Sequence, residues 1–222
     1  NSRPKLFPLL TGKAVHVSLR HGNTEESCGA YSHYAVILVS IFGNIPSAFE
    51  LSEMSLRLSD KLDDSRSRGM VLLIHADQIN FWRRHFATDL PFLERAFLAC
   101  LEAGDLVFAG LSAFATVWQL VEKGDAPDEV LRVSQKYAAL TKQSHNDVLY
   151  NTIRLEQQFV ASLKGWTREP TSFDDGAFDE AACLAEIAGA GFGVGIALYH
   201  VMKQSSAVVH GLYGEALTYA AQ

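Results

Sequence analysis

The chain has 222 residues, of which 48% are hydrophobic and 20% charged, a composition that allows a sizeable core and argues against disorder. Its formal net charge of −6 argues against a nucleic-acid partner, because phosphate binding requires clustered Lys and Arg. No apolar run is long enough for a membrane span and no signal-peptide pattern opens the chain, so we expect a cytoplasmic protein.

The first half of the chain shows helical periodicity, with apolar residues spaced three and four apart. Two helices are predicted over 31–42 and 51–62, joined by the turn GNIP (43–46), where Gly suits a left-handed helix end and Pro the next first turn. Further helices are predicted over 70–81, 93–100 and 108–121. The last of these is apolar on most sides and should be the inner helix of its pair.

The periodicity continues beyond the turn KGDAPDE (123–129), where Asp125 is expected as an N-cap and Pro127 in the first turn. Helices follow over 130–140 and, after the capping sequence SHND, over 149–163. The long connection 165–180 is either a flexible, irregular join or a binding loop in which Trp166 and Phe173 anchor a ligand.

Alternating β-branched runs of strand length are absent, so the predicted fold class is all-α. Turn signals recur about every 40 residues, which favours a tetratricopeptide-like α-solenoid of stacked antiparallel helix pairs. Residues 1–222 are therefore expected to form a single helical-repeat domain. Because the chain starts without Met and stops inside a predicted helix, we expect it to be a fragment of a longer polypeptide.

Four stretches carry a further signal: HGNTEES (21–27), IFGNIPSAFELS (41–52), LEAGDLVFAGLSAF (101–114) and FDE (178–180). Each has a packing or turn role; Gly22, for example, ends a helix before Asn23 or Thr24 as the next N-cap. Together they resemble the tetratricopeptide-like region of large bacterial multi-sensor signalling kinases, which combine a serine/threonine-kinase-like domain, a STAND-type ATPase, a GAF domain and a histidine kinase. The resemblance implies a scaffold or regulatory region within an ATP-binding two-component signalling protein.

The glycine-rich stretch GAGFGVG (189–195) is where the chain departs from that family. A P-loop needs GxxxxGK followed by Ser or Thr, whereas Ile196 and Ala197 follow here, and a dinucleotide fingerprint needs a preceding strand. We therefore expect Gly189 to end one helix and the other three glycines, Gly191, Gly193 and Gly195, to let the next helix approach a neighbour closely.

No catalytic, cofactor or metal-binding residues are predicted. The eight histidines form no HExxH or Glu-x-x-His pair, GxSxG is absent, and the three separated cysteines are expected to be reduced and buried. His75, with Asp77 and Gln78 on an otherwise apolar helix, must find polar partners across the helix pair.

The predicted function is therefore protein interaction, with a partner protein or neighbouring domains of the same chain bound on a concave face. Aromatic and Arg residues enriched at interfaces are the candidates: Tyr31, Tyr34, Trp82, Arg83, Arg84, Trp118 and Tyr137. Self-association into a homo-oligomer is left open. The alternative is a small-molecule sensor or cryptic enzyme with a pocket between the inner helices.

Overall fold

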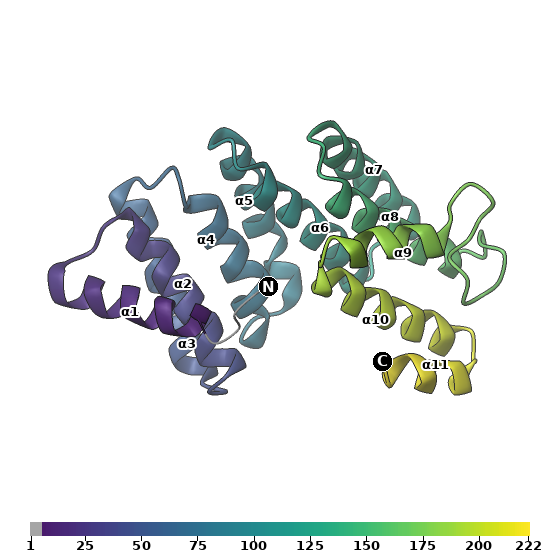
Figure 1. Cartoon of the computed structure of the whole chain (residues 1–222), viewed down its shortest axis with the longest axis horizontal. Coiled ribbons are helices and arrows are strands. Elements are labelled where there is room, and N and C mark those ends of the chain that lie inside the picture. The colour runs from purple at the N-terminus through teal and green to yellow at the C-terminus, as the bar shows by residue number, and fades with distance from the viewer. Residues whose placement is uncertain (1–5) are drawn as a thin grey trace. The chain divides into compact units, whose positions relative to one another are not determined.

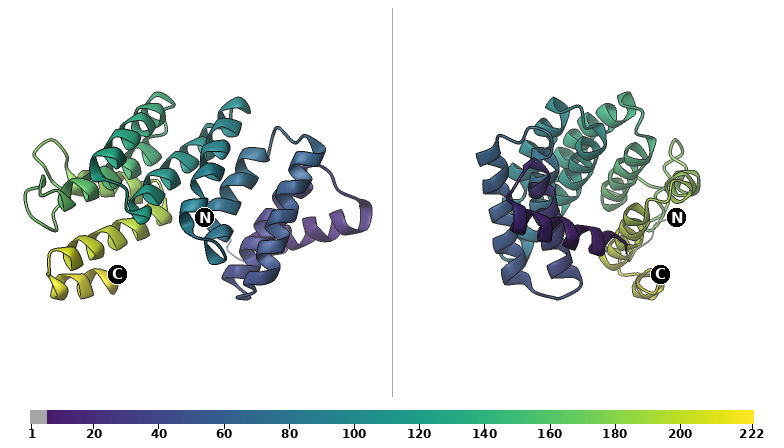
Figure 2. Two further views of the ribbon diagram at one scale, coloured as in Figure 1. Left: turned by 180° about the vertical axis from the view of Figure 1, so that it is seen from behind. Right: turned by 60° about the vertical axis from the view of Figure 1, so that its left-hand side comes forward.

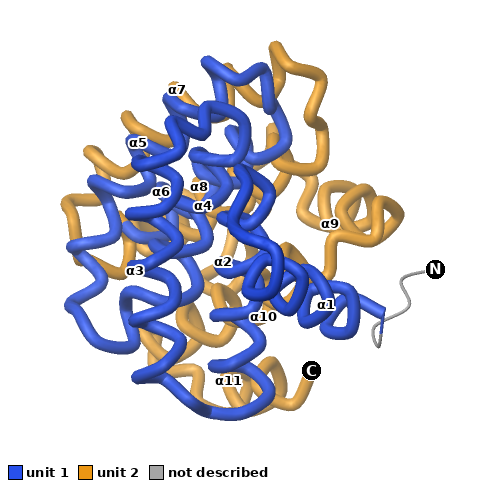
Figure 3. Tube along the Cα trace, turned by 90° about the vertical axis from the view of Figure 1, so that its left-hand side faces the viewer, with its two compact units in different colours: residues 1–119 blue, residues 120–222 orange. Residues whose placement is uncertain are grey.

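The structure is a computed structural model that describes residues 6–222, and all of its regular secondary structure is helical (Figure 1). This confirms the predicted all-α class. The chain divides into two compact units, residues 1–119 and 120–222, drawn in different colours in Figure 3. Within each unit, helices adjacent in sequence pack as pairs, as a helical-repeat fold requires. The assignment of residues 1–222 to one domain stays a prediction.

Over the described residues, unit 1 contains six α-helices, connected by short turns except between α4 and α5. They are α1 (Leu6–His21), α2 (Glu25–Ser40), α3 (Ile45–Leu62), α4 (Arg68–Ile74), α5 (Leu90–Glu102) and α6 (Leu106–Lys123), whose last residues enter unit 2. Helices α2 and α3 lie side by side in Figures 1 and 2, as do α4 and α5. The predicted turn GNIP separates α2 from α3, and the Asn44 side chain caps α3 by accepting from the Ser47 N–H.

The core of unit 1 is built from these helix faces. One cluster joins α4, α5 and α6 through Leu72, Leu73, Ala76, Leu93, Ala96 and Ala115. Phe108 and Leu111 of α6 pack against this cluster, as their predicted apolar stripe requires. A second cluster joins α2, α3 and Ile79. The apolar periodicity of the sequence therefore marks the buried face of α5, whereas the buried face of α3 carries Ser52, Ser55 and Ser59 beside Ala48 and Phe49.

The prediction of a regular helix over 70–81 is wrong in its second half. Regular α4 ends at Ile74 and is followed by a π-helical turn (His75–Ile79) and a short 3₁₀ turn (Asn80–Trp82). Within this wide turn the ring of His75 is buried, and its Nδ1 lies 3.0 Å from the Ser52 hydroxyl on α3. Burial lowers the pKa of His75 to about 4. The polar partner expected for His75 is thus supplied by the neighbouring helix.

Unit 2 contains the other helices and the long loop. They are α7 (Pro127–Gln143), α8 (Asp147–Leu163), α9 (Glu180–Gly189), α10 (Gly193–Val209) and α11 (Tyr213–Ala220). Helices α7 and α8 form one pair and α10 and α11 another. Asp125 is not the N-cap of α7, because Ala126 occupies that position and the Asp125 carboxylate lies 2.8 Å from Lys123 Nζ. Pro127 does begin α7.

Left-handed residues end most helices and mark the repeat. They recur about every 20 residues over much of the chain, at Gly22, Gly43, Asp63, Gly104, Gly124, His145 and Gly165. Two of these, Asp63 and His145, are not glycines. Between α1 and α2, Thr24 rather than Asn23 is the N-cap. Turn chemistry therefore fixes the helix lengths.

The glycine-rich stretch between α9 and α10 is a helix junction. Gly189 ends α9, as predicted, and Gly191 has a left-handed φ of 73°. Close packing is limited to Gly195, where an added Cβ atom would lie 2.7 Å from the Phe192 ring. The expectation was wrong for Gly191 and Gly193, which have no such neighbour within 4 Å. Across residues 6–222, no helix combines the length and apolar character needed to cross a bilayer.

The close approach of α4 to α5 generates a prediction. An added Cβ atom at Gly69 would overlap the Cys100 side chain and lie 2.9 Å from the Cys100 nitrogen. Gly69→Ala should therefore force the helices apart and lower the free energy of unfolding by about 2 kcal/mol. Urea unfolding followed by circular dichroism measures the change.

Gly12→Ala is the matched control, because no heavy atom lies within 4 Å of the corresponding Cβ position in α1. It should leave stability unchanged or raise it by up to about 1 kcal/mol through helix propensity. Equal unfolding midpoints for the two variants would contradict close packing at Gly69.

Candidate functional site

A groove of unit 2 lies between α7, α8 and the loop that follows α8. Its volume is about 410 Å³. The side chains with polar or aromatic groups on its wall are Gln135, Lys142, Tyr150, Arg154, Gln157, Gln158, Trp166 and Asp175. A concave site with a few placed polar groups is the usual form of a ligand or peptide site.

Two buried glutamines form the floor of the groove. Gln157 Nε2 donates to Ser134 Oγ on α7 at 3.0 Å, and Gln158 Nε2 donates to Asp175 Oδ2 in the loop at 2.9 Å. Gln158 Oε1 is buried and accepts no hydrogen bond from the residues that the structure describes. Because a buried acceptor without a donor is unfavourable, this oxygen is available to an N–H or O–H group of a ligand.

Charged groups give the groove a mixed electrostatic character. Lys142 Nζ lies 5.3 Å from the Tyr150 ring centroid, and the Arg154 guanidinium lies 5.4 Å from that of Phe178. Asp175 accepts backbone hydrogen bonds from Ala177 and Phe178 in addition to Gln158. The bond from the Ala177 N–H is the main cause that lowers the pKa of Asp175, which stays ionised at neutral pH. The groove wall thus carries two cations and one carboxylate that accepts three hydrogen bonds.

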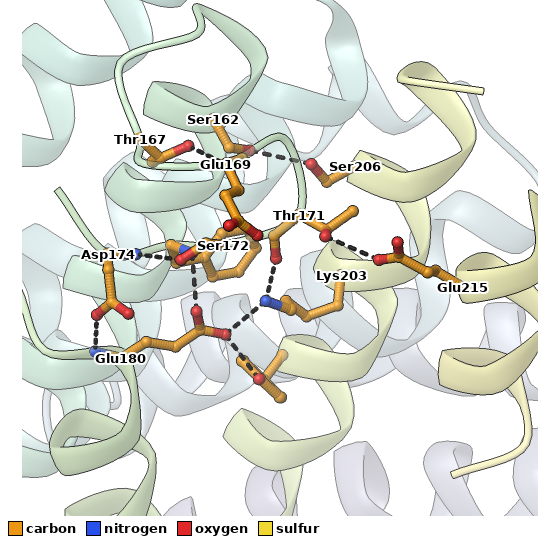
Figure 4. A network of polar contacts seen from close by, with 12 residues as sticks. Ser162, Thr167, Glu169, Thr171, Ser172, Asp174, Glu180, Lys203, Ser206 and Glu215 are labelled. Atoms are coloured by element: carbon orange, nitrogen blue, oxygen red, sulfur yellow. Dashed lines mark hydrogen bonds and ion pairs between the residues drawn. The ribbon is translucent and has the colours of Figure 1, made fainter. Parts of the chain in front are cut away.

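The loop that forms one wall of the groove is anchored by a buried ion pair (Figure 4). Lys203 of α10 is only 4% exposed, and its Nζ lies 2.7 Å from Glu180 Oε1 at the start of α9. Lys203 also donates to the Thr171 carbonyl. The same Glu180 carboxylate accepts from the Phe173 N–H and from the Tyr199 hydroxyl, at 2.8 and 2.7 Å. Burial, followed by this contact, raises the pKa of Tyr199.

Further contacts tie the loop to three helices. Ser206 of α10 donates to the Pro170 carbonyl, and Thr171 donates to Glu215 of α11, at 2.7 and 2.8 Å. The Phe173 ring is fully buried, 6.3 Å from that of Phe159 on α8. Phe173 therefore anchors the loop to its own core, whereas Trp166 is 58% exposed and lies on the groove wall. The segment 165–179 is a packed loop with one exposed aromatic residue.

Helix α8 also carries a buried carboxyl group, that of Glu156. Glu156 is fully buried, and neither of its carboxylate oxygens has a hydrogen-bond partner among residues 6–222. Desolvation raises its pKa well above the ordinary value, so the side chain is held as the neutral acid. Glu156 immediately precedes the two groove glutamines. The helix thus carries three consecutive polar residues through an apolar environment.

Of the seven residues predicted for interaction, six lie in unit 1 and Tyr137 lies in unit 2. Trp82, Arg83 and Arg84 are exposed in unit 1, where the two guanidinium groups lie 5.1 and 5.9 Å from the Phe49 ring centroid. Tyr31 is buried and donates to Asn23 at 2.9 Å. The remaining three are half-buried or buried, on α2, α6 and α7: Tyr34, Trp118 and Tyr137.

Of these seven, only Trp82, Arg83 and Arg84 are exposed. The Trp82 side chain is 49% exposed, and its ring lies 5.2 Å from that of Phe81, which is also exposed. Arg83 and Arg84 follow directly. Exposed aromatic rings next to arginines are enriched at the centres of protein interfaces.

Sequence reasoning missed the groove in unit 2 except for Trp166. The sequence signal for the groove is LEQQFV (155–160), in which three consecutive polar residues lie between apolar residues of a predicted helix. Polar residues at such positions must find partners, and Gln158 finds one 17 residues away in the loop. Periodicity places the glutamines on α8, but it does not reveal that contact.

Comparison with known proteins places the chain near a signalling kinase. No family model matches it. A similar curated protein is the hybrid signal transduction histidine kinase G of Dictyostelium discoideum, 23% identical over 162 residues. The match covers 72% of this chain but 5% of the relative, so the chain spans about one twentieth of that protein's length. The chain is thus distantly similar to one segment of a histidine kinase.

The buried ion pair generates a prediction about the loop. Lys203→Met leaves the Glu180 carboxylate without its cation, and should lower the free energy of unfolding by about 3–5 kcal/mol. The loop should then be cut faster by trypsin after the exposed Arg168. Adding Glu180→Gln should restore much of the loss, because no uncompensated charge remains. A Lys203→Met variant as resistant as wild type would show that the pair does not hold the loop.

The buried carboxyl generates a prediction about pH. Because the pKa of Glu156 is raised in the folded state, the wild type loses stability as pH rises above about 4.5, where the unfolded chain releases the proton. Glu156→Gln removes this loss, so the variant should exceed wild type in unfolding free energy at pH 8 and match it near pH 4. Chemical unfolding at both pH values measures the difference.

Glu169→Gln is the control for charge alone, since Glu169 is exposed in the loop. Its stability difference from wild type should not grow with pH. A Glu156→Gln effect that is equal at pH 4 and pH 8 would mean that Glu156 is ionised in the folded protein.

Proposed function

We propose that this chain is a non-catalytic docking segment of an ATP-dependent signal-transduction kinase. The observation that carries the proposal is the 162-residue match to a hybrid histidine kinase of which it covers 5%. A region of that size within a much longer signalling protein is suited to connecting or regulating other domains. The resemblance of HGNTEES (21–27) and LEAGDLVFAGLSAF (101–114) to the helical region of multi-sensor kinases supports the same role.

The groove of unit 2 is the surface that fits docking best. A bound segment would place an N–H group against Gln158 Oε1 and an acidic group between Lys142 and Arg154, and would cover the exposed ring of Trp166. Each contact uses a group that already has a fixed position. Because the loop is anchored by Lys203 and its partners, little additional ordering is required on binding.

Regulation would follow from differential affinity. If the docked partner is a neighbouring ATPase or kinase domain, and the groove binds one nucleotide state of it more tightly than the other, binding shifts the equilibrium toward that state. Coupling of this kind is typically worth 5- to 150-fold in affinity, or about 1–3 kcal/mol. Catalysis by residues 1–222 is not required for this mechanism.

A second candidate function is small-molecule sensing in the same groove. Its volume of about 410 Å³ falls within the range of sites for drug-sized ligands. A screen for ligands that raise the melting temperature separates this function from docking. A ligand at 100 times its dissociation constant adds about 2.7 kcal/mol to the unfolding free energy.

The test of docking is a calorimetric titration of the chain with the segments encoded on either side of it in its gene, with and without ATP. We expect binding of one segment whose dissociation constant changes at least about fivefold with nucleotide. Arg154→Gln and Trp166→Ala should weaken that binding by tenfold or more, about 1.4 kcal/mol each.

Arg132→Gln is the matched control, because Arg132 is an exposed residue of α7 that pairs with Glu129 and does not line the groove. It should bind as wild type does. Trp82→Ala tests whether the aromatic surface of unit 1 is used instead. Binding that ignores nucleotide, or no binding of either segment, would refute the regulatory role.

A further inference from the structure

A second cleft, in unit 1, lies between α3, α4 and α5 and carries an excess of positive charge. Its volume is about 170 Å³, and side chains enclose it more completely than they enclose the groove of unit 2. The polar groups on its wall are three arginines, one serine and one aspartate: Arg57, Arg68, Arg95, Ser59 and Asp60. The size suits a small anion.

The positive charge of the cleft is only partly compensated. Asp60 and Asp63 lie 3.7 and 3.5 Å from Arg68, and their side chains are 62% and 95% exposed, so solvent weakens both pairs. Arg57 pairs with Glu53 at 3.7 Å, again near the surface. Arg95 forms no ion pair with any residue in 6–222. Three guanidinium groups therefore line a cleft whose wall holds one carboxylate.

Two hydrogen-bond donors in the cleft have no acceptor. The Ser59 side chain is 2% exposed, and its hydroxyl is without a partner among the described residues. The Nε of Arg68 is also buried and without a partner. Buried donors are normally paired, because an unpaired one keeps the cost of its desolvation. Both belong to residues on the wall of the same cleft.

We propose that this cleft binds a phosphate group. Phosphate has acceptor oxygens in several directions, which suits a hydroxyl donor and guanidinium groups approaching from three helices, and the carboxylates paired with Arg57 and Arg68 are solvent-exposed, so the guanidinium groups can still attract an anion. In this arrangement Ser59 Oγ and Arg68 Nε donate to the anion, while Arg57 and Arg95 close over it. The inference is independent of the groove in unit 2 and of any docking there.

The phosphate group can belong to inorganic phosphate or to a phosphorylated side chain of a protein. Both are tested on the full 222-residue chain by isothermal calorimetry at fixed ionic strength. One arm uses inorganic phosphate, and the other uses a short phosphoserine peptide together with its unphosphorylated form. A peptide that binds at least tenfold more tightly than inorganic phosphate assigns the site to a phosphoprotein. Comparable affinities assign it to the free anion.

Two variants test the cleft without depending on its stability. Arg57→Gln removes an exposed guanidinium, and Ser59→Ala removes a hydroxyl that has no partner in the empty cleft, so both should fold as wild type does. Each should raise the dissociation constant for phosphate about five- to tenfold. Lys61→Gln is the matched control: it removes one positive charge from the same helix, at an exposed position that does not line the cleft.

Retention of binding by Lys61→Gln, with loss in the other two variants, is the expected result. Equal weakening by Arg57→Gln and Lys61→Gln would mean a general charge effect and would overturn the proposal. So would wild-type affinity in Ser59→Ala, or the absence of phosphate binding in both arms.

Discussion

The fold depends on covering helices that are apolar on several sides. Four consecutive residues of α4, Val71–Ile74, are buried, and a helix of seven residues has no stability of its own in water. It exists because α2, α3 and α5 pack against it. The same constraint governs α8, which is buried over most of its circumference in unit 2. Helices of this kind require neighbours on each side, which is the physical basis of a repeat fold.

Such close packing leaves little space for polar groups, so most buried polar side chains form hydrogen bonds or ion pairs with specific partners. Ser32 and Ser55 are 2.8 Å apart between α2 and α3, and Ser55 also donates to the Cys28 carbonyl. Small hydroxyl side chains satisfy each other while letting helices approach. Lys203 follows the same rule with larger groups, since it combines an ion pair with a backbone acceptor and aromatic rings. Glu156 is an exception to this pairing, because its carboxyl group has no partner among the described residues and burial holds it neutral.

Two of the residues with an unpaired buried polar atom lie on concave surface. Gln158 lines the groove of unit 2, and Ser59 lines the cleft of unit 1. An unpaired polar atom in a well-packed protein requires an explanation, such as an ordered water, an ion or a ligand. The two surfaces differ in chemistry, because the groove has a mixed charge and an exposed Trp166, whereas the cleft is dominated by arginines. One chain could therefore combine a docking surface with a separate response to an anion.

The sequence by itself determined the helical class, the buried faces of helices such as α5 and α8, and nearly all of the turns. Those features depend on local causes: the 3.6-residue spacing of apolar side chains, a left-handed residue after each helix, and Pro in a first turn. It failed where tertiary contacts override the local pattern, as at His75, where a π-helical turn accompanies a buried ring bonded to Ser52.

Only the tertiary structure decided the sites. The groove requires Gln158 to meet Asp175, and the loop requires Lys203 to meet Glu180, contacts that join residues 17 and 23 positions apart. The cleft combines arginines from three helices that no motif links. Helical periodicity says which face of a helix is buried, but it does not specify which residue of another helix lies opposite, because that depends on how the helices pack.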